Sequence, residues 1–202
     1  MNNGNSHSNT ELNQLLEDSR ERLRRMIKLR MDRRLAGRVD ESDIIQEAYA
    51  EAAHRFEKFQ QDSEPCSPFI WLRFLALQKL AQAHRHHIKV QARSVLKEQK
   101  GRHSNMPPMT SAVMAFEFVG NKISPLDAIM VEEARRQVTE ALDALKEVDR
   151  EILAMRHFEQ MSNKEVAEAL DIPLDTAYKR YIRALTRLKG ELGERSVSIP
   201  GF

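Results

Sequence analysis

The scarcity of glycine and proline constrains this fold more than any other feature of the sequence. The 202 residues contain seven of each, gathered in a few places, so long runs remain uninterrupted. Within these runs apolar residues recur three and four positions apart, which places them on one face of an α-helix. We therefore expect an all-α protein.

The first half of the chain predicts three amphipathic helices. Residues 36–40 break the first helix, and Asp43 is expected to cap the second, with Gln46 answering three residues later. The third helix is expected to begin near Pro68, since proline suits a first turn. The expected inward positions are Leu12, Leu15, Leu16, Leu23, Met26, Ile27, Ile45, Ala48, Tyr49, Ala52, Phe56, Phe59, Trp71, Leu72, Leu75, Ala76, Leu80 and Ala83.

The periodic pattern stops between about Ser94 and Ser124 and resumes after Pro125, which predicts a flexible linker between two helical domains. An apolar interruption in this segment, Met114 to Val119, would either dock the linker on a domain or partner or remain a loosely packed loop. The expected parts are a disordered tail (1–10), a first domain (11–93), the linker (94–130), a second domain (131–192) and a second tail (193–202).

Charge and cysteine content narrow the class of protein. Cys66 is the only cysteine, which excludes an internal disulfide and a cysteine-rich zinc site. Residues 1–9 are polar and no apolar run has membrane-spanning length, so we expect a cytoplasmic protein without membrane insertion. The formal net charge is only +2, but cations crowd residues 20–38 and 85–102. They indicate either a face for a polyanion or ordinary solvated helix surface.

Residues 161–188 predict a helix, a tight turn and a second helix. Ser162 and Glu165 form a capping-box pattern, and Pro173 is expected to start the second helix. Ala177, Leu185, Leu188 and either Tyr181 or Ile182 would anchor it. Its other side suits recognition of the DNA major groove, although two helices and a turn also occur in ordinary bundles. The candidate DNA contacts of this unit are Lys164, Thr176, Tyr178, Lys179, Arg180 and Arg183.

The motifs around this unit resemble region 4 of the sigma-70 family. They comprise residues 142–145, 149–158, 161–162, 165–167 and 172, followed by Thr176, Arg180, Arg183 and Ala184. The resemblance implies that the second helix contacts the minus-35 promoter element. The chain departs from the family pattern at Asp171 and Asp175, where glycine is common, and at Pro173, where a capping serine is common. These departures leave open which side chain reaches which base.

The segment Asp43-Ile44-Ile45-Gln46-Glu47-Ala48-Tyr49 resembles sigma region 2.2. The resemblance implies that Asp43, Gln46 and Glu47 bind a coiled coil of the largest subunit of core RNA polymerase. Exposed carboxylates and an amide suit that role because they can pair with basic groups on a partner helix. The alternative is that Asp43 and Gln46 only cap their helix.

Residues 68–72, continuing to 84–87, resemble sigma regions 2.3 and 2.4, which capture and open the minus-10 element. The residues assigned to this face are Gln78, Lys79, Gln82, Arg85 and His86. Gln78 replaces a usual asparagine and Gln82 a usual aspartate, so the minus-10 preference stays unassigned. Trp71 would be either a stacking platform for a base or part of the core, where an aromatic within an apolar stripe more often lies.

Together these resemblances imply a two-domain sigma factor of the extracytoplasmic-function (ECF) group, with no enzymatic activity. Its implied partners are core RNA polymerase, double-stranded and melted promoter DNA and, where one exists, an anti-sigma factor. His84 and His87 lie one helical turn apart but lack a third well-placed ligand, so we expect no metal and no cofactor. Two alternatives remain: a helix-turn-helix regulator with a signalling or dimerisation domain in residues 1–120, and a metal-dependent nuclease using the histidines.

Overall fold

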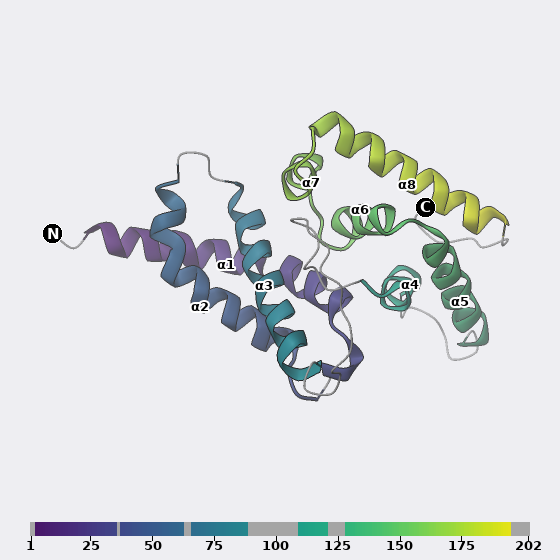
Figure 1. Cartoon of the computed structure of the whole chain (residues 1–202), viewed down its shortest axis with the longest axis horizontal. Helices are drawn as coiled ribbons and strands as arrows, with labels where there is room; N and C mark the ends of the chain where they lie inside the picture. The colour runs from purple at the N-terminus through teal and green to yellow at the C-terminus, as the bar shows by residue number, and fades with distance from the viewer. Residues whose placement is uncertain (1–2, 36, 63–65, 89–108, 121–127, 195–202) are drawn as a thin grey trace. The chain divides into compact units, whose positions relative to one another are not determined.

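The computed structural model describes residues 3–35, 37–62, 66–88, 109–120 and 128–194. Every regular element in these ranges is helical, which confirms the all-α prediction. The helices form two compact units, each described separately below. The first contains α1, η1, α2 and α3, and the second contains α4, α5, α6, α8 and most of α7 (Figure 1).

The first unit packs three helices pairwise against one another: α1 (Asn3–Arg30), α2 (Glu41–Gln60) and α3 (Pro68–Ile88). A short 3-10 helix, η1 (Arg33–Leu35), follows α1 and contacts α3. Most core residues come from the predicted apolar stripes, although Leu29, Leu35 and Ile44, which were not predicted, are also buried. Their burial stabilises the unit by removing apolar surface from water. The side chains buried almost completely include Leu23, Met26, Ile27, Ala48, Ala52, Leu72, Leu75, Ala76 and Leu80.

The amino end of α2 differs from the prediction, because its N-cap is Asp40 and not Asp43. Gly37 turns the chain with a φ of 83°, and Asp40 is extended, so the helix begins at Glu41. Asp43 therefore occupies the third helical position, where its carboxylate accepts a hydrogen bond from the Asp40 backbone N–H at 3.0 Å. The Asp40 carboxylate in turn accepts from the Asp43 N–H at 2.9 Å. The pairing of Asp43 with Gln46 as a cap was wrong.

Trp71 is part of an aromatic cluster between α2 and α3. Its ring stacks on Phe59 with centroids 4.4 Å apart and planes 15° apart, and its distance to the Phe56 centroid is 6.1 Å. Such offset stacking adds to the burial of the rings themselves. Of the two roles predicted for Trp71, the structure shows the packing role.

The second unit is built around α8 (Leu174–Glu194), which packs against α5 (Ala128–Ala144) and α6 (Glu147–His157). A short helix, α7 (Asn163–Leu170), precedes α8 across a tight turn (Figure 1). The apolar stripes of α5 and α6 are buried, and both helices contact α8, which contributes small buried residues. The core members include Val138, Ala141, Leu142, Ile152, Leu153, Ala177, Ala184 and Leu188.

Two segments are helical although their sequences show no periodic pattern. Part of the expected linker forms α4 (Ser111–Val119), which packs on α5, with Met114 buried and the Phe118 ring edge-on to Phe158 at 4.7 Å. The apolar interruption is thus docked on its domain. In the first unit, α1 already begins at Asn3, within the expected tail. The other linker residues, 89–108 and 121–127, lie outside the described residues.

Candidate nucleic-acid interface

Hydrogen bonds hold both ends of α7, the short helix that leads into α8. The predicted capping box is confirmed: the Ser162 N–H donates to the Glu165 carboxylate at 2.7 Å, and the Glu165 N–H donates to the Ser162 hydroxyl at 3.2 Å. Asp171 ends α7 with a φ of 53°, and the Ile172 N–H closes the turn on the Ala167 carbonyl at 3.0 Å. Aspartate tolerates this left-handed conformation better than most residues, so it can replace the usual glycine.

One side of α8 anchors the helix in its unit. Ala177, Ala184 and Leu188 are buried, and the Tyr181 hydroxyl lies 3.2 Å from His157 Nε2. The sequence left Tyr181 and Ile182 as alternative anchors; Tyr181 points inward, whereas Ile182 is exposed. Burial, with the nearby Arg156 as a second cause, lowers the pKa of His157 below its ordinary value.

An ion pair adds a directional restraint between α6 and α8. Asp149 is buried on α6, and its carboxylate accepts a hydrogen bond from the guanidinium of Arg187 on α8. The next residue, Arg150, donates to the Leu142 and Leu145 carbonyls at 3.1 and 2.7 Å. These bonds join α6 to the carboxyl end of α5, where backbone carbonyls run out of helical partners. The Asp149–Arg187 pair restrains the position of α8.

The predicted minus-35 contacts lie away from this anchored side. Tyr178, Lys179 and Arg183 are exposed on α8, Thr176 and Arg180 are half-buried, and Lys164 is exposed on α7. The Lys179 ammonium pairs with the Asp175 carboxylate at 2.7 Å, an exposed i,i+4 pair of small energy. Phosphates could displace that carboxylate at low cost. Two exposed apolar residues on α8, Leu174 and Ile182, were missed as interface residues, although their spacing of four from Tyr178 was a signal.

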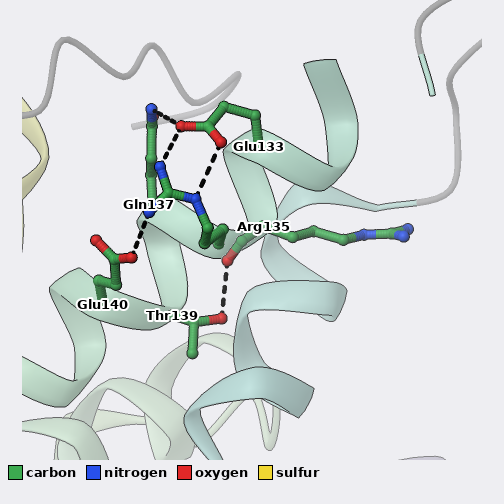
Figure 2. A network of polar contacts seen from close by, with 6 residues as sticks. Glu133, Arg135, Gln137, Thr139 and Glu140 are labelled. Atoms are coloured by element: carbon green, nitrogen blue, oxygen red, sulfur yellow. Dashed lines mark hydrogen bonds and ion pairs between the residues drawn. The ribbon is translucent and has the colours of Figure 1, made fainter. Parts of the chain in front are cut away.

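The outer surface of α5 has a different electrostatic character. The Arg136 guanidinium donates hydrogen bonds of 2.6 Å to the carboxylates of Glu133 and Glu140. Figure 2 shows Glu133, Gln137 and Glu140 of this network. Gln137 also donates to Glu133 at 2.6 Å. These bonds raise the pKa of Arg136 and lower that of Glu133, chiefly through their mutual hydrogen bonds. With two carboxylates to one guanidinium, this cluster has a net negative charge and offers little attraction for a phosphate backbone.

The predicted polymerase contacts form one exposed group on α2. Asp43, Gln46 and Glu47 are all exposed, and their spacing of three and four places them on the same side of the helix. Asp43 also serves the capping box with Asp40. A partner could therefore meet its remaining carboxylate surface without unfolding the helix start.

The α3 residues assigned to the minus-10 element divide into two sets. Gln78, Gln82, Arg85 and His86 are exposed. Lys79 is instead mostly buried, and its ammonium pairs with Glu51 of α2 at 3.1 Å, which lowers the pKa of Glu51.

One aromatic residue of α3 was missed by the sequence reasoning. Phe74 is exposed and lies four and eight positions before Gln78 and Gln82, so the three share a face. An exposed aromatic cannot be told from a buried one by an apolar pattern alone.

The structure gives no support to a metal centre in its described part. No group of three histidine, cysteine, aspartate or glutamate residues is arranged there to hold a metal ion. His84 is half-buried, and burial lowers its pKa, while the His87 side chain lies outside the described residues. None of the described helices is long and apolar enough to cross a membrane.

Comparison with known proteins finds similarity over part of the chain. Residues 135–188, which span most of α5 through most of α8, match the family described as "Sigma-70, region 4". Over 75 residues the chain is 36% identical to a protein of Streptomyces coelicolor named "RNA polymerase sigma-E factor". That similarity covers 37% of this chain and 42% of the relative, so the chain matches less than half the length of that relative.

Proposed function

We propose that this chain is a sigma-70 family RNA polymerase sigma factor of the ECF group and that it recruits core RNA polymerase to promoters. In this proposal the second unit reads the minus-35 element. The first unit binds the polymerase and opens the minus-10 element, and the chain itself catalyses no reaction. It would act in the cytoplasm, where its polymerase and DNA are.

The observation that carries the proposal is the division of α8 into an anchored side and an outward side. A helix that enters the major groove must be held rigidly by its domain while it presents cations and hydrogen-bonding groups to DNA. Asp149 and His157 of α6 hold the other side of α8 through contacts with Arg187 and Tyr181, and Ala177 and Ala184 on that side are buried. Lys179 and Arg183 are exposed on the outward side, and both lie within the region 4 match.

The first unit supports the other half of the proposal through two exposed faces. The α2 group of Asp43, Gln46 and Glu47 can pair with basic residues of a polymerase helix. On α3, Phe74 adds an aromatic surface beside the polar residues, and an unstacked base can gain about 1–3 kcal/mol by stacking on an aromatic ring. The anti-sigma partner stays a prediction, because no described surface identifies one.

A simpler helix-turn-helix regulator is the second candidate, favoured by the limited extent of the family match. Residues 135–188 include little beyond the DNA-reading unit. In that case the first unit would respond to a signal or form dimers, and the chain would not bind polymerase directly.

The two functions are separated by the binding of full-length chain to purified bacterial core RNA polymerase. The sigma proposal predicts a stable complex that initiates at specific sites, which core polymerase alone does not. Glu47→Lys should weaken the complex, whereas Glu57→Lys, a matched charge reversal at another exposed position of α2, should leave it intact. If the wild-type chain forms no complex yet still binds specific DNA, the regulator is the better account.

A further inference from the structure

We infer that Tyr178 and Ile182 select thymine in the upstream promoter element through contact with its 5-methyl group. This inference rests on the proposed function and deepens it, since it states which chemical feature of the DNA the outward side of α8 recognises. The residues that carry it are an apolar stripe of Leu174, Tyr178 and Ile182 along the recognition helix.

The stripe is exposed although its members are large and apolar. The exposed fractions are 55% for Leu174, 51% for Tyr178 and 41% for Ile182. Successive members are four positions apart, so the stripe stays within an arc of about 80° on the helix. Inward packing of α8 uses Ala177, Ala184 and Leu188 instead. A single exposed apolar residue needs no explanation, but three in line do.

The charges beside the stripe identify DNA as the occupant. Lys179 and Arg183 directly follow Tyr178 and Ile182 in sequence, and both are exposed. An apolar protein helix would have to desolvate these cations without compensation, whereas DNA places phosphates on both sides of its groove. The acidic residue beside them on α8, Asp175, is already paired with Lys179 at 2.7 Å.

Thymine is the base that fits an apolar side chain in the major groove. There it presents a 5-methyl group beside its O4 acceptor, and side chains such as alanine, the threonine methyl and phenylalanine contact that methyl. Uracil has the same hydrogen-bonding groups without the methyl. Replacing thymidine by deoxyuridine therefore removes only the feature that the stripe is inferred to read.

The test begins with selection of binding sites from a pool of random DNA duplexes by the full chain together with core polymerase. Each thymidine of an enriched upstream element is then replaced singly by deoxyuridine, and the affinity is measured. We expect at least one replacement to weaken binding by about threefold to fivefold, the effect of one buried methyl group. Ile182→Ala or Tyr178→Ala should abolish the difference between the two duplexes at such a position.

A matched control is Val148→Ala, because Val148 is 50% exposed on another helix of the same unit. This variant should keep the full penalty for deoxyuridine. The inference is overturned if the enriched upstream elements contain no thymine, if no replacement weakens binding, or if the penalty survives in both α8 variants. It is also overturned if these variants weaken polymerase binding alone, since the stripe would then contact protein. Failure to enrich any sequence would instead refute the proposed function.

Discussion

Breaking the ion pair between α6 and α8 should loosen the recognition helix while leaving the first unit intact. The Asp149 side chain is 8% exposed and that of Arg187 is 50% exposed. Removing one partner of a fully buried pair costs about 3–5 kcal/mol, whereas exposed pairs contribute about 0.2–1 kcal/mol. With only one member buried, Arg187→Met should cost about 1.5–2 kcal/mol, or roughly a tenfold to thirtyfold increase in opening of α8.

Amide hydrogen exchange along α8 in the full-length chain measures this opening directly. Lys189→Met, a matched removal of an exposed cation on the same helix, should leave exchange nearly unchanged. Fluorescence of Trp71, the only tryptophan, monitors the first unit and should not change. The double variant Asp149→Asn/Arg187→Met should cost less than the sum of its single changes, because the pair is lost only once. Additive costs, or unchanged protection in Arg187→Met, would refute the reasoning.

Three further predictions address the helix start, the buried histidine and the DNA contacts. Asp40→Ala should destabilise the first unit by about 1 kcal/mol in urea unfolding followed by Trp71 fluorescence, and no loss would show that Asp40 is not the cap. Burial lowers the pKa of His157 below its ordinary 6.5, so the unfolded chain takes up a proton first. The second unit should thus lose stability as the pH falls from about 7.5 to about 5.5, measured by urea unfolding followed by circular dichroism, with a smaller loss in His157→Gln. Arg180→Ala should weaken specific promoter binding by about 1–3 kcal/mol in a gel-shift titration, and unchanged binding would remove Arg180 from the interface.

The sequence predicted helices best where the apolar periodicity and the capping residues indicate the same helix as the observed structure. Runs of apolar residues three and four apart identified the helices of both cores, and the pattern of Ser162 and Glu165 matched the hydrogen bonds at the amino end of α7. At α2 two aspartates lay within three positions of each other, and the sequence pattern did not distinguish the cap from its partner. The extended backbone at Asp40 decides between them.

The missed features depend on tertiary packing. The nine residues of α4 are too few for a stable isolated helix, and its stability comes from contacts such as Phe118 with Phe158. Whether an apolar residue is buried also depends on what packs over it, so Phe74 and Ile182 were not recognised as exposed. Likewise Lys79 was predicted to contact DNA, because the sequence alone does not show that its ammonium pairs with Glu51 of the neighbouring helix.

The central claim is that one chain contacts polymerase with its first unit and promoter DNA with both units. The most direct measurement is sequencing of RNA 5′ ends made in vitro by core polymerase on genomic DNA, with and without the full-length chain. The account predicts new starts that share two upstream motifs at a fixed separation, and their loss with Glu47→Lys or Arg180→Ala. If the chain leaves the pattern of starts unchanged, or if Glu47→Lys does not affect the new starts, the account is contradicted.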